Sequence, residues 1–341
     1  MKRNVLTILA ALLVLVLLAG CAGPIVVVEQ PKQTEPAPLA DGALKTGLAI
    51  LPAISKSVSA TADINGKAEY DVTVVAVTVD EKGIIHSCVI DSIGATSEFT
   101  AAGAPVAAGT VEVKSKNELG FDYGMVAYKA SAIGKEWFQQ AAALAAFAEG
   151  KTLEQVKAGI AGGYASDADL ATSASIYLGG YVSGMEAAIA NAEYLGAETG
   201  QTLKLAVNAT VEAGAGSVQL NLDAAALTVS GDVITSCLID SLQAKVEYDA
   251  TGTITTDVNA APRTKNELGF DYGMVAYKAS GIGKEWFEQA AYFCDYVTGK
   301  TFAQVAGIAV NESGKTTDAD LAAGCTVAIG DFRKLIEKAE N

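Results

Sequence analysis

Hydrophobic and polar residues alternate along two stretches of the chain, and each stretch predicts a β-hairpin. Residues 70–79 run with a period of two, a glycine-bearing turn follows at 80–83, and 84–90 resumes the alternation. The second stretch has the same order: 217–229, a turn at 230–232, and 233–239. A further strand is predicted after each hairpin, at 109–114 and at 252–258.

Helical periodicity follows each pair of strands. Apolar residues at helical spacing predict a helix that opens within 131–138 and ends at Gly150, a plausible C′ glycine, and its partner runs from about Lys284 to Gly299. A short helix is expected at 153–160, and each half closes with a longer helix, at 176–192 and 327–338. The predicted class is α+β, with antiparallel strands packed against helices.

The two halves are copies of one unit. The sequence KNELGFDYGMVAYKAS occurs at Lys116–Ser131 and again, unchanged, at Lys265–Ser280. Flanking segments match in the same order, so the chain divides into tandem copies at about 43–195 and 196–341. We call the two identical segments the repeated loops.

The first twenty residues predict a lipoprotein signal peptide. Lys2 and Arg3 precede an apolar run, and Leu18-Ala19-Gly20-Cys21 resembles a lipobox, which implies that Cys21 is lipidated. An uncleaved membrane anchor is the alternative, although the run is short for a spanning helix. Residues 21–42 are proline-rich and predict an extended linker. We expect a protein anchored to the cell membrane and facing outside the cytoplasm.

Composition narrows the possible chemistry. The formal net charge of −15 argues against nucleic acid as a partner. His86 is the only histidine, and Thr235 takes its place in the second copy, which disfavours Ser-His-Asp catalysis and histidine-ligated zinc. We predict no metal ligands and no catalytic residues. Spacing alone cannot pair the remaining cysteines, which are Cys88, Cys237, Cys294 and Cys325. Cys88 and Cys237 are repeat equivalents within predicted strands and are interpreted as small buried thiols.

The candidate chemistry lies just before each final helix. Residues 169–175 read Asp-Leu-Ala-Thr-Ser-Ala-Ser, and 320–326 read Asp-Leu-Ala-Ala-Gly-Cys-Thr. We call these segments the hydroxyl motifs. A phosphate at a helix start would meet unpaired N–H groups and a partial positive charge. Each motif ends in a hydroxyl residue, Ser175 or Thr326; one interpretation is that these residues merely cap the helices or lie near the helix starts.

The hydroxyl motifs resemble those of small extracytoplasmic FMN-binding domains, as found in bacterial flavin-bearing lipoproteins and redox-pump subunits. That family carries Asp-x-x-Ser/Thr-Gly-Ala-Ser/Thr, and a flavin transferase joins FMN to the last hydroxyl through a phosphoester. The order of hairpin, Ile-Gly-Lys loop, Gly-Lys-Thr helix end and hydroxyl motif also matches. This chain departs from the pattern at Ser173, Ala323 and Cys325. The resemblance implies FMN binding at these positions: Ser175, Thr326, Asp169, Asp320, Thr172 and Gly324.

The identity of the repeated loops needs its own explanation, because packing rarely demands identity in a polar, glycine-bearing loop. Under the resemblance, aromatic residues and glycines would flank the flavin ring, which adds Tyr123, Gly124, Tyr272 and Gly273 to the candidate site. Two alternatives stay open: contacts between the copies, or a recent duplication that left the segment uniform.

The function implied by the resemblance is that of a membrane-anchored electron carrier, rather than an enzyme with its own substrate. Its partners would be the membrane, a flavin transferase and unidentified redox proteins. The competing interpretation is a surface lipoprotein that uses the duplicated fold to bind a ligand or partner without flavin.

Overall fold

The computed structural model describes residues 41–340, which form antiparallel sheets and helices and thereby confirm the α+β class. The predicted signal peptide, Cys21 and nearly all of the linker fall on residues 1–40, outside the described residues. Within residues 41–340, no helix has both the length and the apolar character that a membrane span requires.

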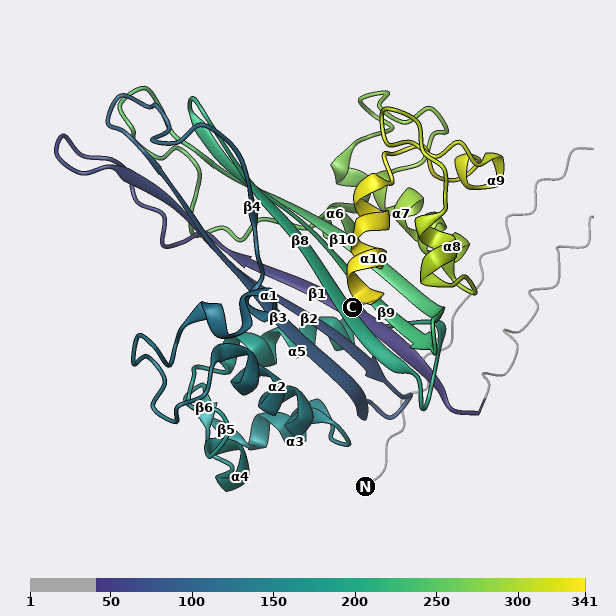
Figure 1. Ribbon diagram of the computed structural model, residues 1–341. Helices are drawn as coiled ribbons and strands as arrows, with labels where there is room; N and C mark the ends of the chain where they lie inside the picture. The colour runs from purple at the N-terminus through teal and green to yellow at the C-terminus, as the bar shows by residue number, and fades with distance from the viewer. Residues whose placement is uncertain (1–40, 341) are drawn as a thin grey trace, which may run out of the picture. The chain divides into compact units, whose positions relative to one another are not determined.

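Two four-stranded antiparallel sheets form the centre of this region (Figure 1). The first has the strand order β3-β2-β1-β7, and the second has the order β10-β9-β8-β4. The predicted hairpins are β2–β3 and β9–β10, and their strands extend further than the alternation indicated. The strands are β1 (Ala43–Ala53), β2 (Gly66–Val79), β3 (Ile85–Phe99), β4 (Gly109–Val113), β7 (Glu193–Glu198), β8 (Thr202–Gly214), β9 (Ser217–Ser230) and β10 (Val233–Glu247), with a small β5–β6 pair at Ile160–Ala161 and Tyr164–Ala165.

Edge strands cross between the copies. β4 belongs to the first copy by sequence, yet it pairs with β8 of the second copy, from Gly109 opposite Ala213 to Val113 opposite Ala209. β7 spans the junction between the copies and pairs with β1 of the first copy. Each sheet therefore consists of three consecutive strands and one added edge strand: β7 is added beside β1, and β4 is added beside β8.

The strand predicted at 252–258 is wrong. This segment forms turns with one isolated bridge, between Tyr248 and Ile254, and the Asp249 carboxylate accepts the N–H groups of Thr251 and Thr253. Its counterpart β4 pairs with Ala209–Ala213 near the end of β8, whereas β1 ends at Ala53 and offers no matching length of strand. Residues 252–254 instead contact the connection after β1: the Gly252 carbonyl accepts the Ala60 N–H, and the Ile254 N–H donates to the Ser59 hydroxyl.

The two sheets pack face to face around one core shared by both copies. Tyr70 is fully buried, and its hydroxyl donates to the Val218 carbonyl across the copies at 2.8 Å. The Phe99 and Tyr248 rings stack with centroids 3.9 Å apart. Removing this apolar surface from water stabilises the sheets only when they are together. Other members of the shared core include Leu48, Ile50, Val72, Ile93, Leu220, Leu222 and Val246.

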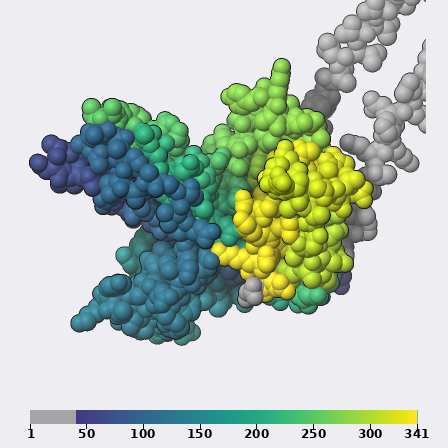
Figure 2. Space-filling model, turned by 45° about the horizontal axis from the view of Figure 1, so that its top comes forward, coloured from purple at the N-terminus to yellow at the C-terminus, as the bar shows by residue number. Residues whose placement is uncertain are grey.

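Helices of each copy cover the outer face of its own sheet (Figure 1). Figure 2 shows the helical part of the first copy, in blue, and that of the second copy, in yellow, as two separate masses. The first copy supplies α2 (Trp137–Ala148), α3 (Leu153–Ala158) and α5 (Gly179–Ala190), and the second supplies α7 (Trp286–Val297), α8 (Phe302–Ala306) and α10 (Gly330–Glu340). Short helices complete the described elements: α1 (Lys116–Leu119), η1 (Gly120–Tyr123), α4 (Ala168–Ala171), α6 (Lys265–Leu268), η2 (Gly269–Tyr272) and α9 (Ala319–Ala322).

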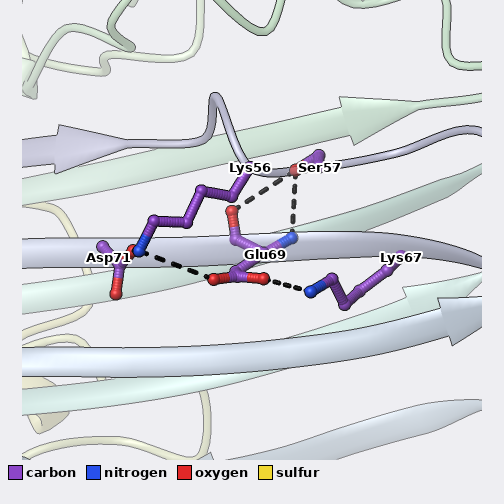
Figure 3. A network of polar contacts seen from close by, with 5 residues as sticks. All are labelled: Lys56, Ser57, Lys67, Glu69 and Asp71. Atoms are coloured by element: carbon purple, nitrogen blue, oxygen red, sulfur yellow. Dashed lines mark hydrogen bonds and ion pairs between the residues drawn. The ribbon is translucent and has the colours of Figure 1, made fainter.

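A polar network holds the connection that follows β1 against strand β2 (Figure 3). The Lys56 ammonium lies 2.6 Å from the Asp71 carboxylate and 3.7 Å from that of Glu69, which also pairs with Lys67. The Ser57 hydroxyl accepts the Glu69 N–H at 3.0 Å. Exposed ion pairs of this kind contribute about 0–1 kcal/mol each, so the network orders the connection more than it stabilises the fold.

Candidate functional site

The repeated loops adopt one conformation in both copies. Each begins with a short helix, α1 or α6, whose capping box joins Ser115 to Glu118 and Thr264 to Glu267. Each then forms a 3₁₀ turn that ends at a left-handed glycine, Gly124 or Gly273. Positive φ values recur at equivalent lysines, with 57° at Lys129 and 56° at Lys278.

A buried aspartate anchors the start of each repeated loop. Asp240 accepts the N–H groups of Ser241 at 2.7 Å and Asn266 at 3.0 Å, and Asp91 does the same with Ser92 and Asn117. Burial outweighs these hydrogen bonds and raises the pKa of both carboxyls, that of Asp240 to about 6. This anchoring gives the identical asparagine a structural role.

A buried glutamate connects each repeated loop to the helix that follows. The Glu136 carboxylate accepts the N–H groups of Met125 at 2.8 Å and Val126 at 3.0 Å, and Glu136 is also the N-cap of α2. Glu285 makes the same two contacts, with Met274 and Val275. This carboxylate therefore sets where the loop lies relative to the adjoining Ile-Gly-Lys segment.

These contacts leave the exposed aromatic residues of the repeated loops unexplained. Phe121 is 73% exposed and Tyr128 is 83% exposed, and Phe270 and Tyr277 match them in the second copy. Phe121 touches Phe138 only edge to face, with centroids 5.2 Å apart. Packing does not require exposed aromatic rings at the same two positions of each copy, whereas such rings are typical of a ligand or partner surface.

The repeated loop of the first copy also contacts the second copy. The Glu118 carboxylate lies 2.7 Å from the ammonium group of Lys338, which belongs to the last helix, α10. Among residues 41–340, Glu267 of the second repeated loop forms no equivalent ion pair, so this contact does not explain the sequence identity of the loops, and it does not involve the exposed rings.

The hydroxyl motifs lie further from the final helices than predicted. Helices α5 and α10 begin at Gly179 and Gly330, so Ser175 and Thr326 each lie four residues before a helix. The N-cap of α5 is Leu178, so Ser175 lies near the start of this helix without capping it. The Leu178 N–H bonds to the Gly163 carbonyl, which holds the preceding residues outside the helix. A helix dipole is therefore not what would hold a phosphate here.

A buried glutamine holds each hydroxyl motif instead. The Gln140 carbonyl oxygen, Oε1, accepts the Ser175 N–H at 2.8 Å, the Ile176 N–H at 3.2 Å and the Ser175 hydroxyl at 3.2 Å. Gln289 binds Thr326 and Val327 in the same way, at 2.8, 3.2 and 3.1 Å. Both glutamines are fully buried. We call this arrangement the glutamine clamp.

The glutamine clamp also reaches the Ile-Gly-Lys segment. The Gln140 amide nitrogen donates to the Lys135 carbonyl at 2.9 Å and to the Ser131 hydroxyl at 3.4 Å. One side chain thus joins the hydroxyl motif to the end of the repeated loop. Both glutamines lie within an apolar helical stripe, and the sequence pattern therefore did not mark them as candidate site residues. Their polarity at a core-facing position, repeated in both copies, was the available signal.

Replacing Gln140 with methionine tests the clamp. The change preserves side-chain volume but leaves the N–H groups of Ser175 and Ile176 without their acceptor, so we expect the free energy of unfolding to fall by roughly 3 kcal/mol. Urea denaturation of the whole protein measures this loss. Gln243→Met is the matched control, because Gln243 is exposed on β10. Equal, small losses in both variants would show that the clamp does not hold the motif.

The lysine of the Ile-Gly-Lys segment lies next to the hydroxyl motif, with different neighbours in each copy. Lys135 donates to the Ser173 hydroxyl at 3.2 Å. Lys284 instead lies over the Tyr292 ring, 4.9 Å from its centroid, and that ring covers Gly324 so closely that a Cβ there would come within 2.3 Å. The first copy has Ala143 at the position of Tyr292. Gly324 therefore has a packing role.

The remaining candidate residues lie around this centre. Asp169 and Asp320 are exposed on α4 and α9, where Asp167 and Asp318 supply the caps. The Thr172 hydroxyl donates to the Asp169 carbonyl at 2.8 Å. Tyr123 and Tyr272 are half-buried, each with a lysine ammonium 5.2 Å from its ring centroid. Tyr123 and Gly124 precede Met125, whose N–H bonds to Glu136 and not to the hydroxyl motif, while the glutamine clamp joins the motif directly to Ser131 and Lys135.

Among residues 41–340, no three His, Cys, Asp or Glu side chains are grouped so that they could bind a metal ion. The groups that the structure gathers around the hydroxyl motifs are hydroxyl, amide, lysine and aromatic side chains. Comparison of this chain with protein-family models, curated proteins and solved structures finds no match.

Proposed function

We propose that this protein carries FMN on Ser175 and Thr326 through phosphoester bonds and acts as an electron carrier, anchored outside the cytoplasm by lipidated Cys21. The observation that carries the proposal is the glutamine clamp. In both copies it holds a half-buried hydroxyl beside the Ile-Gly-Lys segment and next to a repeated loop with exposed aromatic rings.

The hydrogen bonding of the clamp suits esterification of the hydroxyl. An amide carbonyl has two lone pairs, and two backbone N–H groups already fill those of Gln140. The Ser175 hydroxyl is a third donor to the same oxygen. Converting this hydroxyl to an ester therefore removes a surplus donor and leaves no buried acceptor unpaired. The same account holds for Gln289 and Thr326.

Charge and aromatic surface complete the support for FMN. Lys135 brings an ammonium group next to the hydroxyl motif of an otherwise acidic protein, which favours a phosphate there. The exposed rings of Phe121 and Tyr128 offer planar apolar surface to a planar ligand. Bound FMN would supply the electron-transfer chemistry, while the protein's groups hold and orient it. The exposed carboxylates of Asp169 and Asp320 would be accessible to a flavin transferase.

Intact-mass measurement tests this function. Full-length protein produced together with a flavin transferase should be yellow and heavier by two FMN less two water molecules. Protein produced without the transferase is the control. A colourless product of unmodified mass, from cells in which the transferase modifies a known substrate, would overturn the proposal.

The exposure of the four aromatic rings also favours a second candidate, a flavin-free interaction module. In that case protein isolated from its native membrane carries no flavin, and Tyr128→Ala with Tyr277→Ala releases a co-purifying partner. Under the flavin proposal, the native protein is already yellow.

A further inference from the structure

Two cysteine side chains meet in the core behind the second sheet. Cys237 lies on β10 and Cys294 on α7, and their sulfur atoms are 3.1 Å apart. The two residues are 3% and 5% exposed. A third thiol, Cys325 of the hydroxyl motif, belongs to the same core cluster. The two closest sulfurs are thus already within about 1 Å of the disulfide bond length.

The first copy shows that this cysteine pair is not a requirement of the fold. Cys88 is the counterpart of Cys237, but Ala145 stands where the second copy has Cys294. Cys88 and Ala145 are both buried in the equivalent cluster behind the first sheet. The same sheet-to-helix contact therefore forms with one thiol in one copy and with two in the other.

The cysteine pair also borders a cavity of about 590 Å³. Residues of both copies line it, including Leu48 and Asn191 from the first and Phe287 and Asp295 from the second. A small disulfide reagent therefore has space beside the two sulfurs without unfolding the sheet. Burial raises the pKa of Cys237, so exchange in the folded protein should be slow and faster during folding.

We propose that Cys237 and Cys294 form a disulfide bond that links helix α7 to strand β10. Two S–H bonds break and one S–S bond forms, with release of two protons and two electrons. The electrons reduce the disulfide of a second molecule, either a thiol oxidoreductase or a small disulfide such as oxidised glutathione, to two thiols. The inference does not depend on flavin.

The disulfide would close a chain loop between residues 57 positions apart. This loop contains the second repeated loop and Gln289, so the bond constrains much of the second candidate site. A loop of this size restricts the unfolded chain considerably. We expect reduction to lower the melting temperature of the protein by about 5 °C.

Peptide mapping of full-length protein isolated from its native membrane tests the pairing. The protein is denatured with an alkylating reagent and without reductant, then digested. We expect a peptide pair linked through Cys237 and Cys294, with Cys88 alkylated. Alkylation of both Cys237 and Cys294, in native protein and again after reduced protein is treated with oxidised glutathione, would overturn the proposal. A bond between Cys294 and Cys325 would overturn it as well.

Thermal unfolding with and without reductant supplies a second readout. Wild-type protein should melt at a lower temperature after reduction, and Cys237→Ala should show no such difference. Cys88→Ala is the matched control and should respond to reductant as the wild type does. Because the wild type is compared with itself, a folding defect in a variant leaves the test intact. An unchanged wild-type melting temperature after reduction would contradict a disulfide bond between α7 and β10.

Discussion

Ser175→Ala will leave a protein that carries one FMN instead of two, and Thr326→Ala will remove the other. The reason is chemical: without the hydroxyl oxygen no phosphoester can form at that position. The fold should persist, because Gln140 keeps its two backbone donors. Losing the third hydrogen bond, from the hydroxyl, lowers the free energy of unfolding by about 0.5–1.5 kcal/mol. Intact mass counts the flavins, and thermal unfolding confirms that each variant is folded.

Neighbouring hydroxyls provide the controls for this result. Ser173→Ala removes the group that Lys135 contacts, and Thr172→Ala removes the one that bonds to Asp169. Both variants should keep two flavins, and Ser175→Thr should as well. Retention of both flavins in the Ser175→Ala, Thr326→Ala double variant would place the attachment elsewhere in the chain.

Neither copy will fold as a monomer when produced alone. A fragment of the first copy, residues 41–198, exposes the inner face of its sheet, including Tyr70, Ile93 and Phe99, and leaves β4 without its partner β8. A fragment of the second copy, residues 199–340, lacks β4 and exposes Leu220 and Leu222. A sheet with one large apolar face open to water associates or fails to form.

Light scattering and thermal unfolding of the two fragments check this expectation. We expect self-association or the absence of a cooperative transition in each fragment. Mixing the two fragments should restore a one-to-one complex with a cooperative transition, and residues 41–340 in one chain serve as the control. A monomeric fragment that unfolds cooperatively would show that one copy has sufficient core of its own.

Local pattern was enough to predict the hairpins and the main helices. β2 and β9 alternate between buried and partly exposed residues in their first halves, and a glycine-bearing turn follows each strand, so the periodicity and the turn signal agree. β1 was not predicted, because its middle residues are buried on both faces and Pro52 interrupts it near the end. The pairing of β4 with β8 and of β7 with β1 could not be predicted from the sequence either, because strand pairing depends on which sheet edges are free in three dimensions.

The sequence predicted only part of the candidate site, because the rest depends on tertiary contacts. The motif spacing located Ser175 and Thr326, but it placed them too close to the final helices. Tertiary hydrogen bonds to Gln140 and Gly163 fix the backbone of Ile176 and Leu178, and α5 begins only at Gly179. No local pattern in 169–179 indicates them.

The shared core implies how the gene arose. An ancestor with a single unit would have had an open apolar face, and a second molecule of itself was the available cover, which makes that ancestor a homodimer. Fusing the two genes ended the requirement that both partners be the same. Differences such as Ala143 against Tyr292 and Ala145 against Cys294 could then accumulate on one side alone, which leaves the two candidate sites free to acquire different properties.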